Sequence, residues 1–363
     1  MLDKRLLSEL DGLTIGLVLL LSLVGVVMIY SAARLLSGAY CLRQLTWIGV
    51  GLAALFLVLL VDYKVLLSLA YYAYFLVVIV LAGLMVSARL VAGTRSWITV
   101  GGFRAQPSEI AKIALILVLA RLFAEHRGAY VRWPRLMMAV ALAAVPVVLV
   151  VLQPDLGTAL TFLPIVLGAL ILAGLRRRTI IVSLVLAAAV AAGGWNFVLK
   201  DYQKQRLTTL VHPAADTRGA GYQILQSKIA IGSGGLAGKG FLRGSQSQLR
   251  FLPARHTDFV LSVVGEEFGF LGIAVVLGLY VLLLIKLFVV AGMARDRAGV
   301  YIVFMVALLL AFQFFVNVLM IIGLFPVTGV PLPLLSYGGS SLFSTYLAVG
   351  LVLNIKMRRF ANV

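Results

Sequence analysis

Ten apolar runs, separated by polar gaps, constrain the fold of this 363-residue chain more than any other feature of its sequence. A helix of about 20 apolar residues crosses the hydrocarbon core of a bilayer, and most of the runs are near that length. In lipid, backbone N–H and C=O groups must be paired internally, which favours helices. Only 12% of the residues are charged and 62% are hydrophobic, which excludes the soluble globular class. The runs lie at 12–32, 44–61, 65–87, 108–124, 135–152, 157–174, 179–198, 258–287, 299–324 and 338–355.

The sequence therefore predicts an all-α integral membrane protein, a bundle of ten transmembrane helices in a single polytopic domain spanning 1–363. An even number of helices puts both termini on one side, and Lys4 and Arg5 place that side in the cytoplasm. The long gap at about 199–257, between helices 7 and 8, is then outside, yet it carries nine Lys or Arg against two Asp. We expect this outer loop to pack on the bundle and to attract an anion, either a ligand or lipid headgroups.

An unexpected carboxylate stands where the eighth apolar run begins, in the segment RFLPARHTDFVLSVV. Asp258 would lie at the outer boundary of the membrane, close to the basic loop. It could cap the helix, since an acid accepts hydrogen bonds from the first N–H groups and suits the helix dipole. A half-buried carboxylate beside cations is equally suited to be a general base. His256 would not share its helical face and is a candidate hydrogen-bond donor.

Two Gln-Pro sequences place further acids at the same level. QPSEIAKIAL begins the fourth run with Pro107, which favours the first turn of a helix, and puts Glu109 and Lys112 on one face. These two residues form either a simple helix-start ion pair or part of a site. QPDLGTAL puts Asp155 in the turn before the sixth run, where an Asx-turn or an N-cap is the structural alternative. Three separate segments therefore bring carboxylates to one depth, those of Asp258, Glu109 and Asp155.

Two irregular segments complete the outer side. AIGSGGLAGKGFLRGSQSQ interleaves glycines with Lys239 and Arg243, and exposed N–H groups beside cations suit phosphate oxygens, although a flexible loop has the same composition. The segment is not a Walker A motif, so no nucleotide is implied. GLFPVTGVPLPLLSYGGSSLF contains three prolines and must line a cavity or be buried in protein. Its hydroxyls, Ser336 among them, are candidates to hold a sugar, and a structural plug is the alternative.

Together these segments resemble a known family. GTRSWITVGGFRAQPSEIAK, QPDLGTAL, KIAIGSGGLAGKGFLRGSQSQLRFLPARHTDF, GEEFGFLG and PVTGVPLPLLSYGGSSL are similar to motifs of the SEDS family (shape, elongation, division and sporulation) of cell-wall polymerases. The resemblance spans essentially the whole chain and favours the elongation branch, RodA, over the division branch. One departure is visible: where members usually carry Glu after FLP, this chain has Ala254 followed by Arg255, which argues against an acid acting there.

The resemblance implies a peptidoglycan glycosyltransferase of the bacterial cytoplasmic membrane, which polymerises lipid II on the outer face during cell elongation. It also implies a class B penicillin-binding protein as the crosslinking partner, together with other membrane proteins of the elongation complex. Asp258 matches the family's essential carboxylate, and Glu109, Lys112 and Asp155 match residues that line its central cavity. An α-linked donor would give a β-linkage by single displacement with inversion.

This reaction assigns roles to the candidate residues. Asp258 would accept the proton of the attacking sugar hydroxyl. A divalent cation, Mg²⁺ or Mn²⁺, would help to stabilise the pyrophosphate leaving group, with Asp258, Asp155 and Glu109 as candidate ligands, although no ligand set can be read from the sequence. No organic cofactor and no nucleic acid partner is expected. The cations that would stabilise the leaving group are, in order of preference, Lys112, Arg104, Lys239 and Arg243.

Two rival functions use the same features. A transporter or flippase for the same lipid would need alternating access, with ionisable residues near the midplane and repeated halves. The acids here gather at the outer edge, and no convincing internal repeat is found, so transport is the weaker alternative. A non-catalytic scaffold for a partner protein explains neither the basic loop nor the acids.

Overall fold

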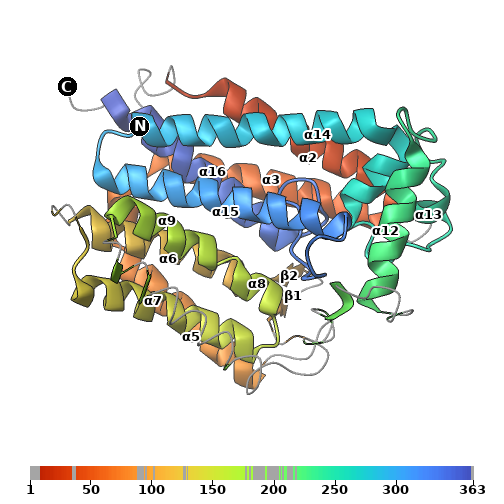
Figure 1. Ribbon diagram of the computed structural model, residues 1–363. Coiled ribbons are helices and arrows are strands. Elements are labelled where there is room, and N and C mark those ends of the chain that lie inside the picture. The colour runs from red at the N-terminus through yellow and green to blue at the C-terminus, as the bar shows by residue number, and fades with distance from the viewer. Residues whose placement is uncertain are drawn as a thin grey trace.

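A computed structural model shows a bundle of long helices (Figure 1). The structure describes residues 9–34, 38–87, 94, 96–100, 103–125, 128, 130–175, 178, 179, 181, 182, 193, 204, 206, 208–210, 216 and 219–360. In its first half the elements are α2 (Gly12–Ala33), α3 (Ala39–Leu60), α4 (Tyr63–Ser68), α5 (Ala70–Ser87), β1 (Ile98–Val100), β2 (Phe103–Ala105), α6 (Pro107–Ala124), α7 (Trp133–Leu152), α8 (Leu156–Leu160) and α9 (Leu163–Ala173). The second half contains α12 (Ala220–Gly234), α13 (Ser245–Gln248), α14 (Val260–Met293), α15 (Arg297–Ile321), α16 (Gly339–Met357) and the 3-10 turn η2 (Arg358–Phe360).

Seven helical segments among the described residues are long and apolar enough to cross a membrane, so the chain is a multi-pass membrane protein. These segments are α2, α3, α7, the stretch of α8 and α9, α14, α15 and α16. Helix α5 is apolar but shorter, and α6 carries three charged side chains within its 18 residues. The predicted seventh run, 179–198, lies outside the described residues apart from a few isolated positions.

Several helix boundaries differ from the apolar runs. The third run is divided at Leu69 into α4 and α5, and the sixth is divided between α8 and α9. Helix α14 extends to Met293, six residues beyond its predicted end, and is kinked at Gly269, where φ is 65°. Apolarity alone does not locate such breaks, because it reports what lipid tolerates and not where the backbone turns.

The all-α prediction missed a two-stranded hairpin. Strands β1 and β2 are antiparallel, with Thr99 opposite Arg104, and β2 leads directly into α6. Three-residue strands are too short to be detected among runs of 20 residues. The hairpin matters because it contacts α16 and so helps to fix the start of α6 beside the start of α16.

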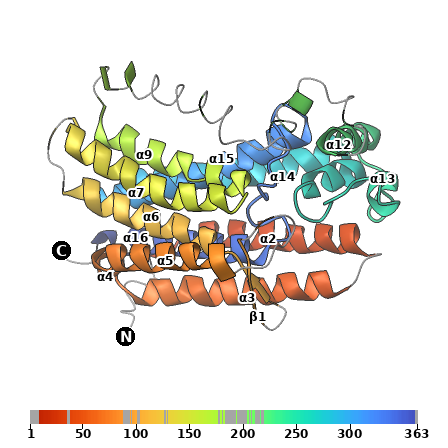
Figure 2. The ribbon, with the colours of Figure 1, turned by 90° about the horizontal axis from the view of Figure 1, so that it is seen from below.

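The two ends of the bundle differ. Both chain termini lie at one end, and α12 and α13 lie at the opposite end (Figure 2). At the terminal end, Lys356 of α16 donates to Asp11 before α2 at 2.6 Å, and Arg358 lies 3.6 Å from Asp62 before α4. The first pair joins the segment before α2 to the last turn of α16, and the second joins the N-cap of α4 to the C-cap of α16. The basic gap at about 199–257 includes a helix, α12, which packs on α14.

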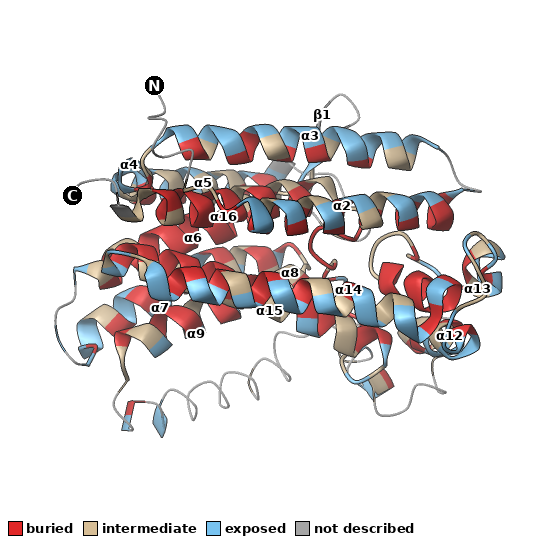
Figure 3. Ribbon diagram, turned by 90° about the horizontal axis from the view of Figure 1, so that it is seen from above, coloured by how far each residue is buried: buried red, intermediate tan, exposed pale blue. Residues whose placement is uncertain are grey.

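Helices α6 and α16 form the centre of the bundle, and their residues are buried nearly all round (Figure 3). The surrounding helices expose large apolar side chains, for example Phe56, Ile79 and Leu271. Apolar surface of this kind is expected to contact lipid rather than water. Polar groups are therefore informative wherever they gather inside the bundle.

Candidate active site

A cavity of about 770 Å³, here called the polar cavity, contains the charged residues that the sequence placed at one level. Glu109 of α6, Asp155 before α8 and Asp258 before α14 all line it, and so does Arg206. The bundle thus brings together carboxylates that are up to 149 positions apart in the chain. The uncharged polar lining consists of Thr94, Gln106, Thr158, Thr257, Thr328, Tyr337, Ser340 and Ser341.

Four helices begin at this cavity. Gln106, Asp155 and Gly338 are the N-cap residues of α6, α8 and α16, and Asp258 stands two residues before the first residue of α14. The N-terminus of a helix carries a partial positive charge and unpaired N–H groups. Because four helices begin at the cavity, their partial positive charges favour the binding of an anion despite the carboxylates in the lining.

Asp258 is available for chemistry. The N-cap residue of α14 is Phe259, and no side chain caps this helix, so the capping alternative for Asp258 is wrong. None of the ion pairs among the described residues includes Asp258. Burial raises the pKa of its carboxyl to about 6, although a hydrogen bond from Thr257 and the charge of Arg206 lower it. The half-buried carboxylate therefore opens into the polar cavity with a raised pKa.

The backbone of Asp258 is held by Asn317 of α15. Its Nδ2 donates to the carbonyl of Asp258 and to the carbonyl of Val330, both at 3.0 Å. The amide N–H of Asp258 donates to the carbonyl of Ala254 at 3.0 Å. Asn317 was missed in the sequence, and its signal was an amide inside an otherwise apolar run, where polar residues usually have a task.

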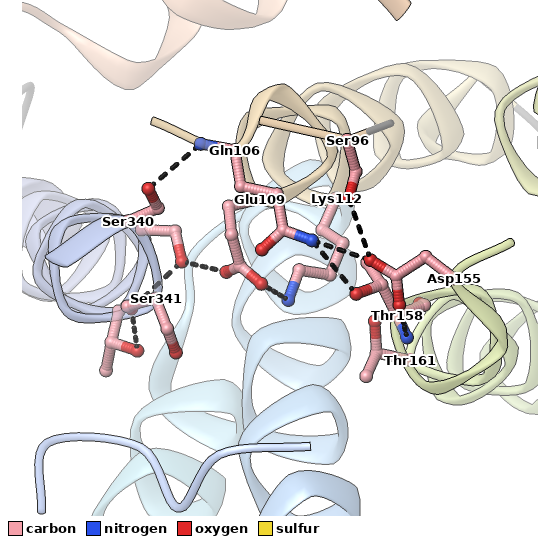
Figure 4. A network of polar contacts seen from close by, with 11 residues as sticks. Ser96, Gln106, Glu109, Lys112, Asp155, Thr158, Thr161, Ser340 and Ser341 are labelled. Carbon is pink, nitrogen blue, oxygen red and sulfur yellow. Dashed lines mark hydrogen bonds and ion pairs between the residues drawn. The ribbon is translucent and has the colours of Figure 1, made fainter. Parts of the chain in front are cut away.

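Glu109 and Lys112 form the predicted ion pair at the start of α6 (Figure 4). Lys112 Nζ donates to Glu109 Oε1 at 2.7 Å, and Ser344 of α16 donates to Oε2 at 2.5 Å. Glu109 is 4% and Lys112 is 1% exposed, and Lys112 is not among the residues that line the polar cavity. A buried pair of this kind is costly to separate, so Lys112 is committed to Glu109 rather than to a ligand.

Asp155 is an N-cap, as its structural alternative predicted. Its Oδ1 accepts from the backbone N–H of Thr158 at 3.1 Å, and its Oδ2 accepts from Gln106 Nε2 at 2.8 Å and from Ser96 Oγ at 3.4 Å (Figure 4). Burial raises the pKa of the Asp155 carboxyl, whereas the bonds from Thr158 and Ser96 lower it. Asp155 therefore lines the cavity as a fixed acceptor. Gln106, which joins α6 to α8, was not predicted.

The glycine-rich segment lies against α14 and does not face the cavity. Lys239 Nζ donates to Glu266 Oε1 at 2.9 Å, and the backbone N–H groups of Lys239 and Gly240 donate to the carbonyls of Glu266 and Glu267. These N–H groups are therefore occupied by protein, which argues against the phosphate-binding interpretation. Arg243 and Arg104 are exposed, and neither they nor Lys239 line the polar cavity.

The remaining two candidates also lie beside the cavity and not in its lining. The Ser336 hydroxyl accepts from the backbone N–H of Leu332 at 2.9 Å, so it stabilises the irregular segment. Its neighbours Ser340 and Ser341 line the cavity instead. The His256 ring packs 5.8 Å from the ring of Tyr337, between centroids, and burial lowers its pKa, which favours the neutral imidazole.

The carboxylates do not form a ready-made metal site. Among the described residues, no group of three His, Cys, Asp or Glu side chains is placed to hold one ion. Glu109 is already bonded to Lys112 and Ser344, and Asp155 to Thr158 and Gln106. These contacts leave Asp258 as the carboxylate with free coordination capacity, and Mg²⁺ held by so few carboxylates takes its other ligands from water and substrate phosphates.

The comparison with known proteins decides the family. Residues 11–360 match the family model FTSW_RODA_SPOVE, described as cell cycle protein. The chain belongs to this family. The peptidoglycan glycosyltransferase MrdB of Escherichia coli (strain K12) is 42% identical to it over 317 residues, which cover 87% of this chain and 85% of that protein. The peptidoglycan glycosyltransferase RodA of Treponema pallidum (strain Nichols) is 33% identical and covers 98% of this chain and 99% of its own length.

Solved structures agree with the sequence relatives. A chain of a peptidoglycan synthase complex, solved in a study of how polymerisation and crosslinking are coordinated, matches with a TM-score of 0.84 at 34% identity, covering 97% of this chain and 99% of that one. The rod shape determining protein RodA of Thermus thermophilus matches with a TM-score of 0.73 at 32% identity, covering 97% and 98%. The resemblance to the RodA branch of the SEDS family is confirmed.

Proposed function

We propose that Asp258 is the general base with which this peptidoglycan glycosyltransferase joins lipid-linked sugars into glycan strands. The glycosyltransferase activity follows from family membership and from relatives that carry this name along most of their length. The observation that carries the assignment of the base is the contrast among the three carboxylates. Glu109 and Asp155 are bonded on both oxygens, whereas Asp258 opens into the cavity with a pKa of about 6.

The reaction is a single displacement. A sugar hydroxyl of one lipid II molecule or glycan end attacks the anomeric carbon of another. As the new C–O bond forms, the bond from that carbon to the pyrophosphate oxygen breaks, and its electron pair leaves with the pyrophosphate. Asp258 accepts the proton of the attacking hydroxyl. Attack on the face opposite the leaving group converts an α-linked donor into a β-linked product.

The lipid part of the substrate has an apolar path to this chemistry. A groove of about 370 Å³ is lined mainly by apolar side chains, including Trp47, Val77 and Phe343. It shares Gln106 and Glu109 with the polar cavity. A polyprenyl tail in the groove would leave its pyrophosphate and sugars in the cavity, because the two spaces adjoin.

The same proposal includes the placement and the partners of the chain. Ten helices in the bacterial cytoplasmic membrane, with both termini in the cytoplasm, put the polar cavity and the 199–257 loop on the outer side. This orientation is supported by α16, whose N-cap residue Gly338 lines the cavity and whose last turn pairs with Asp11 through Lys356. A class B penicillin-binding protein as partner is supported by the similarity to a chain of a peptidoglycan synthase complex, and we expect other elongation proteins beside it. A divalent cation would arrive with the pyrophosphate and meet Asp258.

The test is glycan formation from purified lipid II by the full chain with its cognate penicillin-binding protein. We expect polymer from the wild type and a loss of roughly 10²- to 10⁴-fold with Asp258→Asn, which keeps the size of the side chain but removes the base. Asp62→Asn, at the opposite end of the bundle, is the matched control and is expected to keep full activity. Wild-type rates with Asp258→Asn would reject the base. No polymer from the wild type would reject the function and favour a lipid transporter.

A further inference from the structure

A pyrophosphate in the polar cavity would be repelled by the negative charges of the cavity lining. Three carboxylates line it, and a pyrophosphate leaving group carries at least two negative charges of its own. The four cations favoured by the sequence do not offset this repulsion, because they are not part of the cavity lining. They are Lys112, Arg104, Lys239 and Arg243. Helix N-termini supply only partial charges, so a full positive charge is still needed.

Arg206 is the only cation among the described residues that line the polar cavity. It belongs to the basic stretch between the seventh and eighth apolar runs, far in sequence from Glu109 and from the irregular segment before α16. The positive charge of Arg206 lowers the pKa of the Asp258 carboxyl, so the two groups interact electrostatically. The position of Arg206 therefore depends on how the loop lies on the bundle, and a reading of apolar runs does not reveal it.

One hydrogen bond holds the Arg206 side chain in place, and its other N–H donors remain available to a ligand. Its Nη1 donates to the carbonyl of Val327 at 3.1 Å, in the irregular segment that lines the same cavity. This contact fixes the guanidinium at the cavity while leaving other N–H groups of the fork to bind a ligand, since arginine has five donors. Arg206 is exposed, so an entering ligand can reach it. A planar fork with several donors matches two phosphate oxygens at once.

We propose that Arg206 binds the pyrophosphate of the lipid-linked donor and stabilises the negative charge that develops on its leaving oxygen. This inference rests on the proposed function and adds a second catalytic residue to it. While the proton of the acceptor hydroxyl goes to Asp258, the electron pair of the breaking C–O bond goes to the phosphate oxygen. Arg206 keeps its protons throughout and acts by hydrogen bonding and charge. The net charge of the outer loop thus includes one cation with a defined target.

The proposal predicts how variants of the full chain, with its partner, bind inorganic pyrophosphate. Pyrophosphate is expected to inhibit wild-type glycan formation in competition with lipid II. With Arg206→Gln the inhibition constant and the KM for lipid II both rise roughly 10- to 100-fold, because a charge-assisted, two-point contact is lost. Arg206→Lys restores part of this, since it returns the charge but not the fork. Lys204→Gln removes a neighbouring loop charge outside the cavity lining and leaves both constants unchanged.

Direct binding separates this inference from the assignment of the base. Titration calorimetry with inorganic pyrophosphate needs no turnover, so Asp258→Asn can be measured as well. We expect Asp258→Asn to bind pyrophosphate at least as well as the wild type and Arg206→Gln to bind it at least tenfold more weakly. Wild-type pyrophosphate binding by a folded, partner-bound Arg206→Gln would overturn the proposal, whatever its activity. A fully active Asp258→Asn would reject the base while leaving the binding result for Arg206 to stand.

Discussion

The activity of this chain is expected to depend on pH through Asp258. Burial raises the pKa of this carboxyl from 3.8 to about 6. A base with a pKa near 6 is roughly nine-tenths deprotonated at about pH 7 and only roughly one-tenth deprotonated at about pH 5. We therefore expect kcat/KM to fall about tenfold between these two pH values. An aspartate with its ordinary pKa would stay charged over the same interval and give a flat profile.

The stability of the fold responds to this group in the opposite direction. Because the pKa of Asp258 is higher in the folded than in the unfolded chain, protonation favours the folded state. This contribution to stability is present in full below pH 3.8, the ordinary pKa of an aspartate, and is lost as pH rises through about 6. Titration of Asp258 therefore lowers activity in acid without unfolding the protein. The two effects are separable, since one is a rate and the other a melting temperature.

The assay is the initial rate of glycan formation at low lipid II concentration, from roughly pH 5 to pH 8, with a melting curve of the complex at each pH. Removing the charge of Arg206, which lowers the pKa of Asp258, is expected to move the acidic limb to higher pH. A profile that is flat between about pH 5 and pH 7 in a complex that stays folded would refute the assignment of Asp258 as a base with a raised pKa.

Four further outcomes follow from the contacts. Lys112→Met leaves the Glu109 carboxylate buried and unpaired, so the complex is expected to lose about 3–5 kcal/mol of stability. Adding Glu109→Gln to this variant is expected to return part of the loss. A melting temperature of Lys112→Met equal to that of the wild type would show that the pair is not buried. Asp155→Ala removes the cap of α8 and costs about 1 kcal/mol, measured by thermal unfolding, and an unchanged midpoint would contradict the cap. Glu266→Ala is expected to release the glycine-rich segment and so to speed up proteolysis within 235–248. Cleavage of this variant at the wild-type rate would show that other contacts hold the segment. Mn²⁺, followed by electron paramagnetic resonance, is expected to bind the complex only when pyrophosphate is present. Stoichiometric binding of Mn²⁺ without pyrophosphate would reveal a resident metal site.

The start of α6 shows what local sequence could predict about the site. Pro107 favours the first turn of a helix, and the three-residue spacing of Glu109 and Lys112 places both on one face, so the ion pair was predictable from a single segment. The N-cap role of Asp155 was equally local. Local reasoning left two roles open for Asp258, a helix cap and a general base, and the backbone path shows that Phe259 takes the N-cap position.

The cations show the limit of composition. The excess of positive charge at 199–257 was visible, but charge in a loop does not say which side chain reaches which surface. Lys239 looked like a phosphate ligand because it lies among glycines, and it is instead bonded to Glu266. Arg206 had no distinguishing neighbours, yet it is in the polar cavity. Contacts between residues far apart in sequence determine both outcomes.

The amino-acid sequence was sufficient to assign the structural class, because the hydrocarbon core of a membrane imposes apolar helices and leaves few places for charge. It also determined the family, through motifs spread along the whole chain, and the identities of the carboxylates at the cavity. The packing of the helices was needed to show which of these carboxylates is free, which are bonded, and which cation shares their cavity. The physical reason is that availability depends on the partners of each polar atom, and residues such as Asn317, Gln106 and Ser344 become partners only when distant helices pack together.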